Sequence, residues 1–264
     1  MSAGTPGPAD GSEASTLVVL SGRRGGTTHL EVELLGTLPP DLRLIGGLAV
    51  MCRVGSPHRT TVDLDAVARD LDDLHESIAR LAMTATGGGQ YRFEGDLDLD
   101  VIDVAPQAAD ALAVELGASG GTLSDLELNL LSLTWAHDGA TPVDAIAVDE
   151  LAGEPLAEAR GRLVATTSGL VAMKSTAIPL RASTRPEKRA SDLYDLGRLL
   201  LVDGAGAARI DGMPAPLDTV VRHRLERWFL DDAGRDRTYR EVRRFDEPKL
   251  DLDAVADAVE DLAG

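Results

Sequence analysis

The sequence predicts an α/β (α+β) fold with two lobes: an N-terminal mixed sheet with flanking helices, and a mainly helical C-terminal lobe. Strand-like segments gather in the first half of the chain, whereas segments with helical apolar spacing dominate the second half. The charge divides in a similar way. Residues 181–249 carry a net charge of +2, and the remainder of the 264 residues carries −20. Such asymmetry is typical of two lobes with different roles.

Composition excludes several classes of protein. Hydrophobic residues make up 44% and charged residues 27%, which excludes wholesale disorder. The single cysteine, Cys52, excludes an intramolecular disulfide and a cysteine-cluster zinc site. The chain shows no signal peptide and no apolar run near the ~20 residues that span a bilayer, so we expect a soluble, cytoplasmic protein with no membrane partner. A net charge of −18 argues against a protein that coats nucleic acid.

The expected catalytic lobe spans residues 17–160 and follows a Ser-, Gly- and Pro-rich tail, residues 1–16, that we expect to be disordered. Apolar residues at helical spacing predict its helices, and alternation between Gly- and Pro-rich turns predicts its strands. The predicted helices cover 27–35, 48–54, 69–83 and 107–116. The predicted strands cover 42–45, 60–67, 91–94, 97–104 and 145–151. Residues 123–135 fit either a helix or a strand.

The expected C-terminal lobe spans residues 161–264 and is built from amphipathic helices. Leu and Val recur on one side of each segment, and Pro186 separates the first helix from the second. The predicted helices cover 167–181, 188–201, 217–230 and 253–262.

Two carboxylates point to a metal site. Asp63 and Asp65 alternate with apolar residues in a predicted strand, so both side chains project to the same side. Neighbouring carboxylates repel each other in a partly desolvated cleft, and a magnesium ion removes that penalty. Surface charge is the alternative interpretation, because Asp96, Asp98 and Asp100 alternate in the same way in an acidic run.

Three further features fit phosphate chemistry. Asp103 stands alone in an apolar strand and is therefore the expected third acid, although an exposed strand end explains it equally well. Gly46 and Gly47 open a helix whose backbone N–H groups suit triphosphate oxygens, or they form a plain tight turn. Arg59 supplies a cation to the same phosphates, or lies at the surface.

A second group of charged residues lies in the expected C-terminal lobe. Lys174 and Arg181 share a helix face across two turns, and Asp192 lies early in the next helix. The alternative for Asp192 is complementation of the helix dipole together with an ion pair to Lys188.

Together these residues resemble the nucleotidyltransferases of the AbiEii/AbiGii toxin family, part of the DNA-polymerase-β-like superfamily. The resemblance covers about residues 42–201. The first family motif, Gly-Gly-x-Ala followed by Arg-x-Thr-x-Asp-x-Asp, is matched by Gly46, Gly47, Ala49, Arg59, Thr61, Asp63 and Asp65. The later motif, Lys-x-x-Ala-x-x-x-Arg and then Arg-Asp-Leu-x-Asp-Leu, is matched by Lys174, Ala177, Arg181, Asp192, Leu193, Asp195 and Leu196. Ser191 replaces the basic residue of that motif, for which Lys188 or Arg189 is the expected substitute, and Gly-Gly stands where many nucleotidyltransferases have Gly-Ser.

The resemblance implies the toxin of a toxin–antitoxin (abortive infection) system that moves a nucleoside monophosphate from an NTP to an acceptor. The implied partners are the NTP, an RNA acceptor such as a tRNA 3′ end, and a cognate antitoxin. Asp63, Asp65 and Asp103 would hold Mg²⁺ or Mn²⁺, Lys174 would neutralise the transferring phosphate, and Asp192 would orient Lys174 or Arg181. The residues implied in nucleotide binding are Gly46, Gly47, Arg59, Thr61 and Arg181.

Two other functions stay open. One is a catalytically inactive nucleotidyltransferase-like binding module, and the other is an antibiotic or small-molecule nucleotidyltransferase. An arginine-rich stretch is the one expected docking place for a polyanion, or else a solvated helix face. It contains Arg222, Arg224, Arg227, Arg235, Arg237, Arg240, Arg243 and Arg244.

Overall fold

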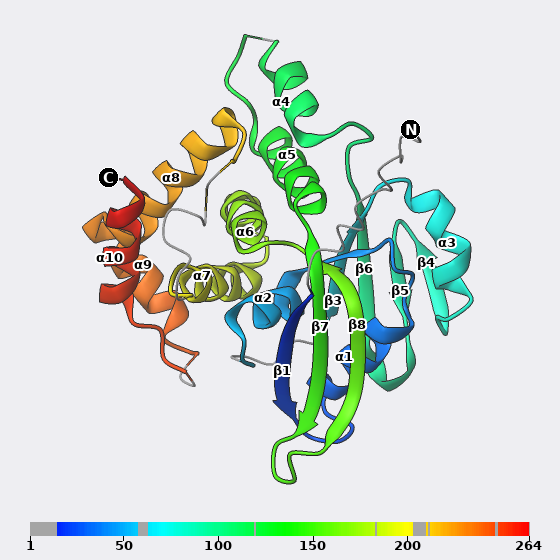
Figure 1. Cartoon of the computed structure of the whole chain (residues 1–264). Helices are drawn as coiled ribbons and strands as arrows, with labels where there is room; N and C mark the ends of the chain where they lie inside the picture. The colour runs from blue at the N-terminus through cyan, green and yellow to red at the C-terminus, as the bar shows by residue number, and fades with distance from the viewer. Residues whose placement is uncertain are drawn as a thin grey trace, which may run out of the picture.

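One mixed sheet organises the chain (Figure 1). The computed structural model describes residues 15–57, 63–118, 120–182, 184–202, 210, 212–245 and 248–263. Eight strands of this described part form the sheet. In their order across it, they are β1 (Thr16–Gly22), β7 (Thr141–Asp149), β8 (Pro155–Val164), β2 (Arg43–Ile45), β3 (Asp63–Ala68), β6 (Asp98–Asp103), β5 (Gln90–Arg92) and β4 (Thr84–Gly87). The β1–β7, β2–β8 and β3–β6 pairs are parallel, and the other neighbours are antiparallel.

Helices flank the sheet and form most of the C-terminal part. Figure 1 shows α8, α9 and α10 on the side of α6 and α7 that faces away from the sheet. The α-helices are α1 (Thr27–Thr37), α2 (Gly46–Val54), α3 (Leu71–Ala79), α4 (Ala109–Gly117), α5 (Asp125–Asp138), α6 (Thr167–Arg181), α7 (Pro186–Leu200), α8 (Ala215–Phe229), α9 (Asp232–Val242) and α10 (Leu252–Ala263). None of the helices in the described ranges is long and apolar enough to cross a membrane.

The predicted α/β fold class is confirmed, with differences in particular elements. The segment 123–135, which fitted either a helix or a strand, is helical from Asp125 onward, in α5. β1, β4, β8 and α9 were not predicted from the sequence. Of the expected tail, residues 1–14 lie outside the described residues, and β1 already begins at Thr16. The expected lobe boundary at residue 160 falls inside β8.

Pro186 begins a helix instead of merely separating two of them. It is the first residue of α7, where a proline loses no hydrogen bond because the first N–H groups of a helix have no partner within it. The helix therefore starts two residues before the predicted position, and Lys188 lies in its first turn.

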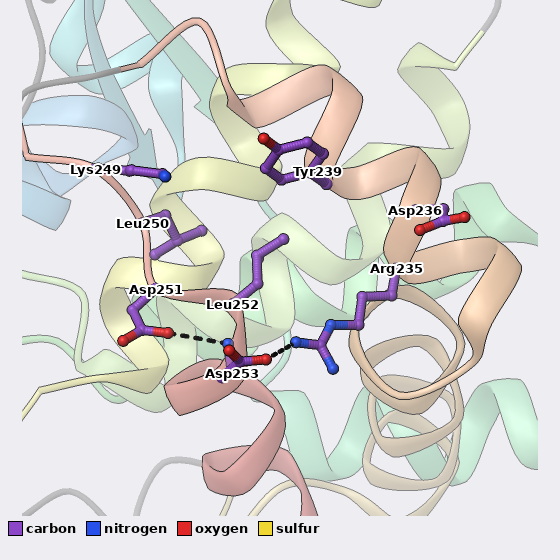
Figure 2. A pocket seen from close by; sticks show the side chains of 8 residues that line it. All are labelled: Arg235, Asp236, Tyr239, Lys249, Leu250, Asp251, Leu252 and Asp253. Carbon is purple, nitrogen blue, oxygen red and sulfur yellow. Dashed lines mark hydrogen bonds and ion pairs between the residues drawn. The ribbon is translucent and has the colours of Figure 1, made fainter.

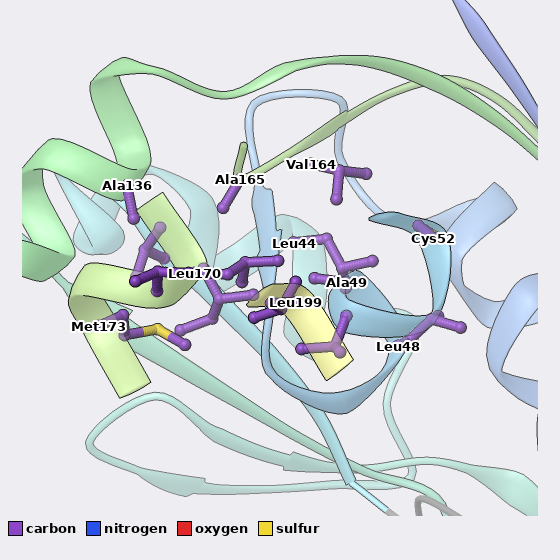
Figure 3. Packing of buried hydrophobic residues seen from close by; sticks show 14 of the residues in the cluster. Leu44, Leu48, Ala49, Cys52, Ala136, Val164, Ala165, Leu170, Met173 and Leu199 are labelled. Atoms are coloured by element: carbon purple, nitrogen blue, oxygen red, sulfur yellow. The ribbon is translucent and has the colours of Figure 1, made fainter. Parts of the chain in front are cut away.

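The hydrophobic core is continuous across the junction between the sheet and the C-terminal helices. β2 and β8 share a single register pair, Leu44 with Val164, and the Ala165 N–H donates to the Leu44 carbonyl oxygen at 3.0 Å. Side chains from α2, α6 and α7 cover this short junction (Figure 3). The packed set includes Leu44, Leu48, Ala49, Cys52, Val164, Leu170, Met173 and Leu199, all buried. This packing holds α6 and α7 beside the strands that carry the acidic residues.

Candidate active site

Four aspartates line one face of two neighbouring strands. Asp63 and Asp65 lie on β3, in register with Asp98 and Asp100 of the parallel strand β6. Residues in direct register on parallel strands share a face, and the strands lie about 4.8 Å apart. The predicted common orientation of Asp63 and Asp65 therefore brings two further carboxylates beside them.

Asp103 does not join this face, which corrects the expected position of the third acid. It pairs in register with Ala68, an odd number of residues from Asp100, so it projects to the other side of the sheet. Its Oδ1 accepts a hydrogen bond from the Leu71 N–H, at the start of α3, at 3.3 Å. Asp100, opposite Asp65, takes the place that the sequence assigned to Asp103.

Gly46 allows the approach of Asp65 to the start of α2. Its φ is +73°, a left-handed conformation that disfavours residues with a Cβ. A Cβ built on Gly46 would lie 2.1 Å from Asp65 Oδ2 and 2.7 Å from Asp65 Cβ. Both Gly46 and Gly47 are buried in the first turn of α2. The Gly-Gly motif therefore makes room for the second acid of the pair.

The pKa of Asp65 depends on charged residues from both the sheet and the C-terminal helices. Burial raises the pKa of this carboxyl, while the positive charges of Lys174, Lys188 and Arg181 lower it and the negative charge of Asp100 raises it further. The net shift is upward. Asp65 of β3 therefore lies close enough to basic residues of α6 and α7 for their charges to lower its pKa, although these residues are more than a hundred positions away in the sequence.

A buried ion cluster joins α6 to α7. Lys174 Nζ donates to Asp192 Oδ1 at 2.7 Å and to Asp195 Oδ2 at 2.9 Å, and Arg181 pairs with the other oxygen of Asp192. The Lys174 side chain is 5% exposed and that of Asp192 is 2% exposed. The expectation that Asp192 reaches Lys174 or Arg181 is confirmed for both, and Lys174 is not a surface residue.

Lys188 connects α7 directly to the acidic face. Its Nζ donates to Asp63 Oδ2 at 2.8 Å, and it does not pair with Asp192 as the alternative interpretation held. The pair lies in a cleft of about 450 Å³ between the acidic strands, the β4–β5 hairpin and the start of α7. The cleft is lined by Asp63, Thr84, Thr86, Gln90, Tyr91, Arg92, Asp98, Asp100, Arg185 and Lys188.

Two of the remaining predicted residues, Arg59 and Thr61, lie outside the described residues. Asp100 and Lys188 contribute to the clusters, although the sequence did not place them among the expected site residues. Asp195, which the sequence gave only as a match to the family motif, binds Lys174. The position of Asp195 three residues after Asp192, on the same helix face, was the signal for it.

Carboxylates on the acidic face are the hard oxygen ligands that magnesium prefers. Across the described ranges, however, no group of three or more His, Cys, Asp or Glu side chains is already arranged to hold a metal ion. Asp63, for example, is engaged by Lys188. The residues therefore fit an ion that completes its coordination with phosphate oxygens and water, and they do not form a finished cage.

A second hollow, of about 490 Å³, lies between α9 and the segment that leads into α10 (Figure 2). Arg235 there pairs with Asp253, and Asp251 Oδ1 accepts the N–H of Asp253 at 3.0 Å at the start of α10. These groups serve ion pairing and helix capping. The acidic cleft is consequently the better candidate for phosphate chemistry.

Half of the eight arginines in the arginine-rich stretch form ion pairs with nearby acids. Four of its arginines pair with carboxylates: Arg222 with Asp218, Arg224 with Asp125, Arg235 with Asp253, and Arg237 with Glu241. Ion pairs of this kind cancel much of the local positive potential.

Replacing Gly46 by alanine should destabilise the protein far more than the same change at Gly55. Both glycines belong to the α2 segment with φ near +75°, but a Cβ on Gly55 meets nothing within 4 Å. Gly55→Ala should therefore cost about 1 kcal/mol for the left-handed backbone alone. Gly46→Ala adds the clash with Asp65 and should cost about 3 kcal/mol or more. Urea unfolding at pH 7 measures both, and equal losses would contradict the contact between Gly46 and Asp65.

Removing Lys174 should unfold the protein much more readily than removing Lys188. Lys174→Met removes the buried ammonium that Asp192 and Asp195 share, which should lower the free energy of unfolding by about 3–5 kcal/mol. The Lys188 and Asp63 side chains are 36% and 28% exposed, so Lys188→Met should cost less than about 1 kcal/mol. Denaturant titration of both variants is the measurement. A small loss for Lys174→Met would mean that α6 and α7 do not depend on the cluster.

Comparison with known proteins agrees with this geometry. The family model described as nucleotidyl transferase AbiEii toxin, type IV TA system, matches residues 33–261. That span contains both acidic strands, the Gly46–Gly47 turn and the cluster around Lys174. No curated protein matches the chain. The resemblance predicted from the motifs is thus confirmed, and the chain belongs to the AbiEii nucleotidyl transferase toxin family of type IV toxin–antitoxin systems.

Proposed function

We propose that this nucleotidyltransferase is metal-dependent and transfers a nucleoside monophosphate from an NTP to an RNA acceptor, such as a tRNA 3′ end, in the cytoplasm. The observation that best supports the proposal is the placement of the acids of β3 and β6 opposite the basic start of α7, in one cleft. A triphosphate with its cation needs both signs of charge within a few ångströms.

In this proposal Asp63, Asp65 and Asp100 bind one or two Mg²⁺ or Mn²⁺ ions together with the triphosphate. Their shared face supplies hard oxygen donors, and the burial that raises the pKa of Asp65 is offset when a cation joins it. When bound, the metal would clamp the triphosphate oxygens and make the attacking hydroxyl of the acceptor more acidic. Asp103 has no part in this set, because it projects from the other side of the sheet.

The residues of α2, α6 and α7 position the nucleotide. Asp192 and Asp195 hold Lys174 in place, and its positive charge acts on Asp65. In this proposal the same positive charge stabilises the negative charge that develops on the transferring phosphate. Arg181 is held beside it by Asp192 and contributes in the same direction. The start of α2 at Gly46 and Gly47 offers backbone N–H groups and the positive end of a helix dipole to phosphate oxygens.

In this proposal the acceptor approaches Asp63 along the β4–β5 hairpin. Thr84, Thr86 and Gln90 of that hairpin line the cleft and carry hydroxyl and amide groups. Such groups suit the hydroxyls of a ribose at the end of an RNA strand. As a type IV system toxin, the chain also has a cognate antitoxin in this proposal.

Transfer to RNA is tested by incubating the full-length protein with Mg²⁺, total RNA and each of the four labelled NTPs in turn. We expect label from at least one NTP to appear in a tRNA-sized band. Asp63→Asn should reduce the label at least about 100-fold, because its carboxylate acts on the reacting groups. Its melting temperature should stay close to that of the wild type, because the Asp63–Lys188 pair is partly exposed.

Other results of this assay identify the alternatives. NTP binding without transfer to any acceptor would support an inactive binding module. Label that appears only with small-molecule acceptors, such as aminoglycosides, would support an antibiotic nucleotidyltransferase. Either result would contradict the proposed RNA acceptor.

The third acid is tested by comparing Asp100→Asn with Asp103→Asn. Both residues lie on β6, but only Asp100 shares the face of Asp65. Asp100→Asn should lower the transfer rate at least about tenfold. Asp103→Asn should stay within about twofold, because asparagine keeps an oxygen that accepts the Leu71 N–H. The rate of label incorporation decides between them, and the reverse order would restore the assignment made from the sequence.

A further inference from the structure

We propose that Lys188 is an exchangeable counter-ion: it pairs with Asp63 in the nucleotide-free protein and transfers to the triphosphate when the divalent cation takes its place at Asp63. This inference rests on the proposed function. It gives a role in the cleft to Lys188, which the sequence offered only as a substitute for the basic residue of the later motif.

The other two cations near the acids are already held in place. Lys174 is shared between two buried carboxylates, and Arg181 pairs with one of them. Moving either of them would take a cation away from a buried carboxylate, which is costly. Lys188 differs, because the structure pairs it with one carboxylate, Asp63, at the surface of the cleft.

The position of Lys188 allows it to change partners. It lies in the first turn of α7, and its side chain is 36% exposed beside the 28% exposed side chain of Asp63. An ion pair in contact with water is weak, so a divalent cation displaces an ammonium from it at modest cost. A lysine carries its charge on a flexible four-carbon stem, so the ammonium moves several ångströms without any shift of the helix.

The acidic face makes such a counter-ion useful before the nucleotide arrives. Asp63, Asp65 and Asp100 share one face and repel one another, and Lys188 is one of the cations that lower the pKa of Asp65. Once a metal ion neutralises these carboxylates, the ammonium is released beside the negative oxygens of the triphosphate. The positive charge of Lys188 then neutralises triphosphate oxygens instead of the Asp63 carboxylate.

The first measurement is the affinity of the full-length, nucleotide-free protein for Mn²⁺, with free Mn²⁺ followed by electron paramagnetic resonance. Lys188→Met removes the competitor for Asp63, so we expect Mn²⁺ to bind about fivefold more tightly than to the wild type. Arg185→Met is the matched control, because Arg185 lines the same cleft with the same charge but Asp63 pairs with Lys188. The control should stay within about twofold of the wild type.

The second measurement is binding of magnesium tripolyphosphate, which carries the phosphate chain without a base. Here Lys188→Met should bind about tenfold more weakly, because one charge-assisted hydrogen bond to phosphate is lost. The two affinities therefore change in opposite directions in a single variant. A lysine that only stabilised the fold would not produce this pattern.

Each outcome is decisive. Unchanged Mn²⁺ affinity in Lys188→Met, or an equal gain in Arg185→Met, overturns the direct exchange at Asp63. Unchanged tripolyphosphate binding overturns the transfer of Lys188 to the phosphate. A wild-type protein that binds neither Mn²⁺ nor tripolyphosphate contradicts the proposed function itself, and it is distinguished from the first two outcomes by the wild-type titrations alone.

Discussion

The ammonium of Lys174, buried between Asp192 and Asp195, fixes α6 against α7, and the candidate site depends on that contact. Charges removed from water are tolerated only while their partners stay in place, so the two helices cannot slide past each other without a large loss of stability. Arg181 uses the remaining oxygen of Asp192 and extends the same constraint to the end of α6. The same contact therefore holds the start of α7 in the position from which Lys188 pairs with Asp63.

A second constraint acts on the sheet side. Ile45 of β2 pairs with Asp65 of β3, and the chain turns directly from Ile45 into α2. The turn places Gly46 against the Asp65 carboxylate, where no side chain would fit. The glycine and the acid are therefore one structural unit, although they lie nineteen positions apart in the sequence. This contact explains physically why a motif that begins with glycines ends with a carboxylate pair.

Local patterns predicted the parts of the site that depend on local geometry. Strand alternation places Asp63 and Asp65 on one face, and helical spacing brings Lys174 and Arg181 to Asp192. The capping box of α5 was also readable, because Ser124 and Glu127 satisfy each other's backbone N–H groups in the Ser-x-x-Glu pattern. This pattern favours a helix that begins at Asp125 over a strand.

The register between strands cannot be predicted from local sequence patterns, and for that reason the expected position of Asp103 was wrong. An isolated acid in an apolar strand is a reasonable candidate, but its face relative to Asp63 depends on pairing with a strand thirty-five residues away. β8 was missed for a local reason. Gly161 adopts a φ of +59° beside an irregularity in the β7–β8 register, so the alternation is broken, and Arg162 turns inward to donate to the Leu38 carbonyl at 2.9 Å.

The distribution of charge constrains the RNA acceptor that we propose. Four arginines of the arginine-rich stretch pair with acids such as Asp218 and Asp253, and the whole chain carries −18. The net charge therefore opposes long-range attraction of a polyanion, and a duplex lying along the surface would be repelled at low ionic strength. Under this proposal, binding energy comes from short-range contacts inside the cleft beside Asp63. A site of that kind favours a single protruding strand end, whose few phosphates enter the cleft, over an extended RNA surface.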